Sequence, residues 1–420
     1  MDINKLLEGI NCDCGKTHTC NIGYVYIEND ATSHLKEICR NFNQILIVAG
    51  QNTFNAAGEI TLKNLEGKNV KKIIFDGSKI LVPDEVAIKT VTENINNTDI
   101  IIGIGSGVIQ DLCKYVSHFN NIPYAIVATA PSMDGYASNG AAMITGGMKT
   151  TFAAGLPLAI IADTDVLKNA PLDMIKAGFG DVIGKFSALN DWKLSHLINN
   201  EYFCDYIYKL TYDQITNVLK LANGILKRDE ESIKALMEAL VVIGILMSFA
   251  GSSRPASGSE HHLSHFFEIT GIIDNTEYFP HGIDVAYSTV ITAEIREKIL
   301  TKRFPDKIYR ETDLNDKINA IYKQSANGCI ELQKKMGRYD NTQISSYLSR
   351  ESEIKAILAE MPTAQQIKDM LNLAKLDISE FYTLYGEEKI KDAILYAKDL
   401  KDRYTVLWLN YDLFGGELNV

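Results

Sequence analysis

Short apolar runs recur along the first 165 residues, and stretches with helical periodicity separate them. Continuous runs of this kind are typical of parallel strands that are buried on both faces of a sheet. The pattern therefore predicts a Rossmann-like α/β domain over residues 1–165, with helices at 52–65 and from Pro83. The predicted strands are 44–49, 72–76, 99–103, 124–127 and 158–162, and a β-hairpin is predicted at 143–152 around Gly146 and Gly147.

The pattern changes near residues 163–171 and is helical from there to the end of the chain. We therefore predict a second, all-α domain over residues 166–420. Its most apolar stretch, 239–251, is shorter than the roughly 20 residues that a membrane span needs. We interpret this stretch as a buried core helix.

Composition narrows the range of functions. A chain of 420 residues exceeds what one hydrophobic core usually supports, so two domains are expected. The formal net charge of −11 argues against nucleic-acid and anionic-membrane partners, which need clustered basic charge. The first residues lack an apolar core of signal-peptide length. We expect a cytoplasmic protein without membrane insertion, and we also expect a homo-oligomer such as a homodimer.

The chain has seven cysteines, and three of them stand with a histidine in the segment Cys12-Asp-Cys14-Gly-Lys-Thr-His18-Thr-Cys20. An odd count with scattered positions favours reduced thiols over disulfides. Three thiols and an imidazole can form a tetrahedral Cys3His zinc site, although zinc ligands normally come from two separated knuckles. We favour a short β-hairpin with free thiols, and the second metal remains an alternative.

The turn between the strand at 99–103 and the next helix is rich in glycine, reading Gly103-Ile-Gly105-Ser-Gly107-Val-Ile-Gln-Asp111. Glycines before a helix N-terminus allow the backbone to approach a phosphate. The spacing departs from Gly-x-Gly-x-x-Gly, so a tight turn without a ligand is an alternative. A polar loop at 128–138 follows the next buried strand, at the end of the strand where such sheets bind ligands.

Four of the eight histidines lie between Ser253 and His281. His261 and His265 are four residues apart and would share one helix face. Together with His281 they suggest a metal site with an acid/base group beside it. Asp181 stands among apolar residues, and a buried acid must be paired or bound to metal. An ion pair with Lys185, one turn later, explains Asp181 equally well.

These stretches together resemble a known superfamily, which contains the iron-type alcohol dehydrogenases, glycerol dehydrogenases and dehydroquinate synthases. Within it, the chain is similar to the glycerol-1-phosphate dehydrogenases, particularly their bacterial AraM-type branch. The motifs that carry the resemblance are at 105–111, 128–135, 178–181, 253–261 and 402–407.

The resemblance implies metal-dependent, NAD(P)-linked, reversible oxidation of sn-glycerol 1-phosphate to dihydroxyacetone phosphate. It implies a divalent metal (zinc, nickel or iron) on Asp181, His261 and His281, with His265 and Asp134 as catalytic residues and His262 as a bystander. Asp134, Asp181 and His265 would contact the substrate, and Arg254 is our candidate for its phosphate because it lies nearby in the sequence. The dinucleotide would contact Gly105, Ser106, Gly107, Val108, Ile109, Asp111, Thr129, Ser132 and Ser138.

Two points stay open at this stage. Some relatives carry an acidic residue near the adenosine ribose where this chain has Gly50-Gln51-Asn52, so NAD and NADP are both candidates. A glycerol or other polyol dehydrogenase on the same scaffold is the alternative enzyme. A catalytically silent protein that binds metal or nucleotide is the alternative outside enzymes.

Overall fold

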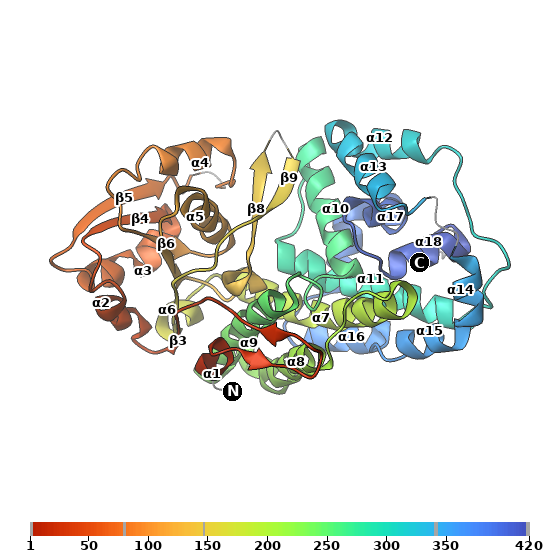
Figure 1. Cartoon of the computed structure of the whole chain (residues 1–420), viewed down its shortest axis with the longest axis horizontal. Coiled ribbons are helices and arrows are strands. Elements are labelled where there is room, and N and C mark those ends of the chain that lie inside the picture. The colour runs from red at the N-terminus through yellow and green to blue at the C-terminus, as the bar shows by residue number, and fades with distance from the viewer. Residues whose placement is uncertain (1–2, 79–80, 146–147, 340–342, 417–420) are drawn as a thin grey trace. The chain divides into compact units, whose positions relative to one another are not determined.

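The computed structural model describes residues 3–78, 81–145, 148–339 and 343–416 (Figure 1). The chain divides into two compact units. The first holds Met1–Val182 and Thr216–Ser253, and the second holds Ile183–Ile215 and Arg254–Val420. Helices α7 (Leu172–Asn199) and α8 (Asp205–Ile225) each pass from one unit to the other, so the division is not the single cut at residue 165 that the sequence suggests.

The first unit contains a six-stranded sheet in the order β3-β10-β7-β6-β4-β5, with every neighbouring pair parallel. All five predicted strands are present, and β6, β7 and β10 are buried along their whole length. The edge strand β3 was missed because its burial alternates, which gives no continuous apolar run. The strands are β3 (Tyr24–Glu28), β4 (Gln44–Gly50), β5 (Asn69–Phe75), β6 (Ile100–Gly105), β7 (Tyr124–Ala128) and β10 (Ala159–Asp163).

Helices follow the strands as predicted. Asp84 caps α4, and its carboxylate accepts the Ala87 N–H at 2.9 Å, so Pro83 lies just before the helix. Strands β8 (Gly140–Thr145) and β9 (Met148–Ala153) pair antiparallel and confirm the predicted hairpin, whose turn residues 146–147 lie outside the described residues. The remaining helices of this part are α1 (Ile3–Leu7), α2 (Leu35–Ile38), α3 (Gln51–Lys63), α4 (Glu85–Thr92), α5 (Gly107–Asn120) and α6 (Thr164–Lys168).

Helix α9 (Glu230–Ala250) is long and apolar enough to cross a membrane by length and composition alone. However, 78% of its most apolar window is buried in the protein. The helix is therefore a core helix, as the sequence predicts for 239–251. It ends at Gly251, whose φ of 69° is the left-handed conformation typical of a helix C-terminus.

The second unit is helical throughout its described residues. Asp191 on α7 organises the part of this unit that holds the histidines. Its Oδ2 accepts the Ser259 N–H at 2.7 Å, and its Oδ1 accepts the Val406 N–H at 2.9 Å. One buried carboxylate thus fixes the first turns of two helices that are distant in the sequence. The helices are α10 (Ser259–Asp274), α11 (His281–Thr301), α12 (Leu314–Tyr322), α13 (Ala326–Lys335), α14 (Ile344–Ser349), α15 (Glu351–Leu358), α16 (Ala364–Asn372), α17 (Ile378–Tyr396) and α18 (Val406–Phe414).

Candidate metal and nucleotide sites

Three histidine rings meet where α10 and α11 pack together in the second unit. His261 and His265 lie one turn apart on α10, with ring centroids separated by 6.2 Å. His281 is the first residue of α11, and its ring lies 5.1 Å from that of His261 and 5.4 Å from that of His265. The structure therefore places His281 beside the two histidines that the i,i+4 spacing singled out.

A buried carboxylate holds His261 in a fixed orientation. Oε1 of Glu260 lies 2.7 Å from Nδ1 of His261 and also accepts the Gly258 N–H at 2.8 Å. Burial, with the nearby charges of Lys185 and His281, lowers the pKa of His261 well below its usual value. Burial, with the charge of Asp191, raises the pKa of Glu260 to about 7. When Glu260 is ionised and His261 is neutral, Nδ1 donates to the carboxylate and the Nε2 lone pair is directed towards a ligand. Metal-binding histidines have this arrangement, and sequence reasoning missed Glu260.

A second grouping in the same unit is also able to hold a metal. His265, Glu268 and His281 each offer a ligand atom, and these atoms lie within 4.8 Å of one another. All three side chains are half-buried, whereas His261 is buried. His281 belongs both to this group and to the predicted ligand set of Asp181, His261 and His281. Two ligand sets therefore have to be compared.

Asp181 lies in the first unit, fully buried on α7. Its Oδ2 accepts the backbone N–H of Asp134 at 2.9 Å, so the structure brings these two predicted residues together. Helix α7 continues into the second unit, where Lys185 is close enough to His261 to affect its pKa. Asp181 lies one helical turn before Lys185 on α7.

Arg254 is buried and engaged in the second unit. Its Nε and Nη2 donate to the two carboxylate oxygens of Glu201, each at 2.5 Å, and Nη2 also donates to the Tyr404 carbonyl at 2.9 Å. Burial alone would raise the pKa of Glu201, but the hydrogen bonds and charge of Arg254 outweigh it and hold that pKa below its usual value. This geometry counts against the phosphate role predicted for Arg254, because two of its guanidinium nitrogens already donate hydrogen bonds to Glu201.

Two other basic side chains lie near the histidines and were not assigned a role from the sequence. Lys401 Nζ donates to Ser257 Oγ at 3.2 Å, just before α10. Burial and the charge of Arg254 lower the pKa of Arg403 to about 10. Lys401 and Arg403 are only half-buried, so solvent can reach them. The motif at 402–407 was visible in the sequence, but nothing in it indicated contact with residues about 140 positions earlier.

His262 lies within this basic cluster. It is fully buried, and neither ring nitrogen has a hydrogen-bond partner among the described residues. Burial, with the charges of Lys401 and Arg403, lowers the pKa of His262 well below its usual value. The lowered pKa favours the neutral form of this ring, whose two nitrogens are buried.

In the first unit, the glycine-rich turn joins β6 to α5. Gly105 ends the strand, Ser106 precedes the helix, and Gly107 is its first residue. A Cβ on Gly105 would lie 2.7 Å from the Cβ of Ile109, so glycine is needed for the strand and helix to pack. At Gly107 an added Cβ would meet only Met133, at 3.8 Å, which leaves the helix N-terminus accessible.

Two cavities lie at the carboxyl ends of these strands. One of about 910 Å³ is lined by Asn52, Thr53, Ser106 and Thr129 among others. A second of about 380 Å³ is lined by a set that includes Gly50, Asp76, Ser106, Val108 and Ile109. This is the end of a parallel sheet where dinucleotides bind. The cavities include four of the predicted cofactor residues and Asn52 of the Gly50-Gln51-Asn52 segment, and they add Thr53 and Asp76, which the sequence did not single out.

Asp111 and Ser138 have a different environment. The buried Lys114 ammonium lies 3.3 Å from Asp111 Oδ1 and 3.3 Å from Ser138 Oγ, and it donates to the carbonyls of Gly135 and Gly140 at 3.0 and 2.8 Å. This network fastens the loop after β7 to α5. Asp111 and Ser138 therefore support the loop, and Lys114 is a positioning residue that sequence reasoning missed.

Comparisons with known proteins agree with this arrangement. A family model described as iron-containing alcohol dehydrogenase matches residues 26–171. Glycerol-1-phosphate dehydrogenase [NAD(P)+] of Halalkalibacterium halodurans is 35% identical over 303 residues, which cover 69% of this chain and 76% of that protein. The chain belongs to the glycerol-1-phosphate dehydrogenase family.

A glycerol-1-phosphate dehydrogenase of Bacillus licheniformis is 27% identical over 97% of this chain and 94% of its own. Among solved structures, the alcohol dehydrogenase from Oenococcus oeni shares the fold with a TM-score of 0.61, at 13% identity, over 92% of this chain and 95% of that one. The predicted family, fold class and oxidoreductase class are confirmed. The expected cofactors, NAD(P) and a divalent metal, agree with the names of the relatives and of the matching family.

Proposed function

We propose that this protein catalyses the reversible, NAD(P)-linked oxidation of sn-glycerol 1-phosphate to dihydroxyacetone phosphate at a metal held by Asp181, His261 and His281. The observation that carries the proposal is the buried Glu260–His261 hydrogen bond of 2.7 Å beside the ring of His281. It is the support that a metal-binding histidine needs. Relatives named glycerol-1-phosphate dehydrogenase [NAD(P)+] share 27% to 37% identity over the matched regions.

Asp181 is proposed as the third ligand on the continuity of α7. A helix turns once in about 3.6 residues, so Asp181 and Lys185 share a face. Lys185 is close to His261 electrostatically, and Asp181 is a fully buried acid that needs a compensating partner. One carboxylate and two neutral imidazoles suit zinc, iron or nickel and leave coordination positions for a substrate.

The chain's own residues position the substrate and move its proton. A bound divalent metal would polarise the substrate oxygen, and a bound nicotinamide would accept or supply the hydride. His265, one turn after His261 and half-buried, is proposed to take the proton of the secondary hydroxyl as the carbonyl forms. Asp134, whose backbone N–H donates a hydrogen bond to the Asp181 carboxylate, is proposed to orient the substrate hydroxyls.

We propose that Lys401 and Arg403, with His262, recognise the substrate phosphate. Two cations near the neutral histidines create a locally positive region in a protein of net charge −11. The unsatisfied ring of His262 offers a further polar contact. Because Arg254 is fixed on Glu201, its charge strengthens this field without contact with the phosphate. Guanidinium and ammonium groups together are well suited to a phosphate dianion.

The dinucleotide is proposed to occupy the two cavities beside the β6–α5 turn. The N-terminus of α5 would bind the pyrophosphate, with Ser106 and Thr129 in contact, while Val108 and Ile109 line the smaller cavity. Asp76, directly after β5, lies in that cavity together with Gly50. A carboxylate at this place accepts hydrogen bonds from the ribose hydroxyls of NAD and repels the 2′-phosphate of NADP.

Replacing Asp76 with asparagine is therefore expected to improve the use of NADPH relative to NADH by about tenfold, or ~1.4 kcal/mol, because a like-charge repulsion is removed. Initial rates over a range of each cofactor give the ratio of kcat/KM values. Glu93→Gln removes an exposed acid of α4 outside both cavities and is the matched control. An unchanged cofactor ratio in Asp76→Asn would place the ribose elsewhere.

The reaction itself is tested with metal-loaded protein. We expect dihydroxyacetone phosphate to be reduced with loss of the NADH or NADPH absorbance, and dihydroxyacetone to react much more slowly. Rates are compared after separate loading with zinc, nickel and iron. Preference for dihydroxyacetone would favour the alternative, a polyol dehydrogenase. No oxidation of either cofactor with any metal would refute the dehydrogenase proposal. The predicted cytoplasmic location and homo-oligomeric state stay predictions.

A further inference from the structure

The N-terminal cysteine segment forms the short hairpin that the sequence favours. Strands β1 (Ile10–Asn11) and β2 (Thr17–His18) pair antiparallel. In the turn, the Gly15 N–H donates to the Cys12 carbonyl at 3.0 Å, and the Cys12 N–H donates to the Lys16 carbonyl at 3.1 Å. Gly15 has a φ of +84°, which an L side chain rarely adopts. This turn folds the chain tightly enough to return His18 to the two cysteines.

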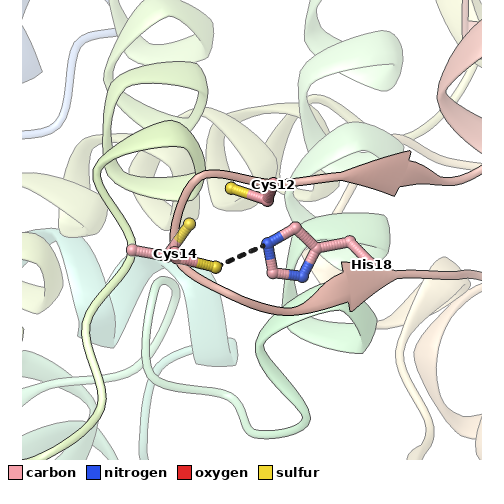
Figure 2. A group of neighbouring side chains, drawn as sticks. Cys12, Cys14 and His18 are labelled. Atoms are coloured by element: carbon pink, nitrogen blue, oxygen red, sulfur yellow. Dashed lines mark hydrogen bonds between the residues drawn. The ribbon is translucent and has the colours of Figure 1, made fainter.

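Cys12, Cys14 and His18 converge at the turn end of the hairpin (Figure 2). Each offers a ligand atom, and these atoms lie within 4.8 Å of one another. Cys14 Sγ lies 3.4 Å from His18 Nε2. A tetrahedral zinc ion, with Zn–S near 2.3 Å and Zn–N near 2.0 Å, places sulfur and nitrogen ligands about 3.5 Å apart. The observed spacing therefore fits two ligands of one ion.

The second nitrogen of His18 is already bonded. Nδ1 lies 3.1 Å from the Phe249 carbonyl and must donate its proton there, because a carbonyl only accepts. The His18 ring is 1% exposed and stacks on the Phe249 ring at 5.3 Å with an interplanar angle of 12°. The ring is thus fixed, and Nε2, which carries no proton when the ring is neutral, faces the Cys14 thiol. A metal-binding histidine has this tautomer and this support.

Cys20, the fourth residue of the sequence cluster, has a different partner. Its thiol is buried and forms a hydrogen bond with Ser248, and burial raises the pKa of this thiol to about 11. The Cys3His set considered from the sequence therefore loses Cys20 and keeps three members. A hydrogen bond between one thiol and the imidazole would explain the position of Cys14 but not that of Cys12, whose sulfur also lies within 4.8 Å of these atoms.

We propose that Cys12, Cys14 and His18 bind a structural zinc ion, separate from the metal of the dehydrogenase site. Each thiol releases its proton as the ion binds, and two thiolates neutralise the 2+ charge. Through His18 the ion fastens the hairpin to the end of α9, where Phe249 lies. The fourth ligand is a water molecule or a thiol outside the hairpin. Cys204, which directly precedes α8, is the thiol outside the hairpin that the variants below test.

Cobalt substitution of the full-length protein tests the proposal, because cobalt bound by thiolates gives a sulfur-to-metal charge-transfer band that nitrogen and oxygen ligands do not give. We expect the band in the wild-type protein and its loss in Cys14→Ser and His18→Ala. Cys20→Ser is the matched control, since it removes a thiol of the same segment outside the cluster, and it should keep the band. The zinc content should fall by about one equivalent per chain in Cys14→Ser.

The wild-type spectrum alone decides the matter if a variant fails to fold. A cobalt-loaded wild-type protein without the thiolate band would overturn the proposal, and so would an undiminished band in Cys14→Ser. A weaker, shifted band in Cys204→Ser would identify a third thiolate. An unchanged band in that variant would leave the Cys2His site with water as its fourth ligand. Activity is not needed for any of these measurements, so failure of the proposed dehydrogenase reaction would leave the result unaffected.

Discussion

His261→Ala is expected to lose the active-site metal and all measurable turnover, whereas His265→Ala should keep the metal and lower kcat by about 10²–10⁴-fold, the usual contribution of a general acid/base. His261 is buried and its ring is fixed by Glu260. His265 is half-buried and is assigned to the proton instead of the metal. Metal content and steady-state rates of purified variants measure both effects.

The competing ligand set gives this prediction its controls. His265, Glu268 and His281 are also close enough to hold an ion. If they are the ligands, Glu268→Gln will lose the metal while His261→Ala retains it. Loss of metal in His262→Ala would mean that the ligand register is shifted by one residue. These metal counts are best made in a Cys14→Ser background, so that the hairpin site does not contribute.

Arg403→Ala is expected to lower kcat/KM for dihydroxyacetone phosphate by about 10²–10³-fold, because removing a charged partner of a bound phosphate costs roughly 2–5 kcal/mol. Turnover of dihydroxyacetone, which has no phosphate, should change little. Arg403→Lys keeps the charge but loses the two-pronged contact, so an intermediate loss is expected. Equal losses on both substrates in Arg403→Ala would contradict the phosphate role.

Arg254→Ala should behave differently, by destabilising the protein. It leaves the half-buried Glu201 without its bidentate partner, and losing such a charged hydrogen-bonding partner costs about 1–3 kcal/mol of unfolding free energy. Denaturant unfolding measures this loss. The double variant Arg254→Met/Glu201→Leu removes both charges and should recover part of the stability. If Arg254→Ala is stable and loses only the phosphorylated substrate, the role predicted for it from the sequence is correct and the one argued for Arg403 is not.

The fold was predictable where local pattern and tertiary environment agree. Strands such as β6 and β7 are buried on both faces, so their sequences are continuous apolar runs. The edge strand β3 lacks that burial, and its sequence gave no such signal. The boundary between the units was also not a local property, because α7 and α8 each contribute to both.

For the candidate sites, the sequence by itself indicated the family through several separate motifs. It indicated the pairing of His261 with His265 and the glycine turn because these depend on spacing along one helix or one loop. Only the tertiary structure decided which partners each side chain has. It shows that His261 is hydrogen-bonded to Glu260, Arg254 to Glu201 and Cys20 to Ser248. Hydrogen bonds and charges act across a few ångströms regardless of chain separation, so Arg254 and Tyr404 meet although they are 150 positions apart in the sequence. That proximity is absent from any linear pattern.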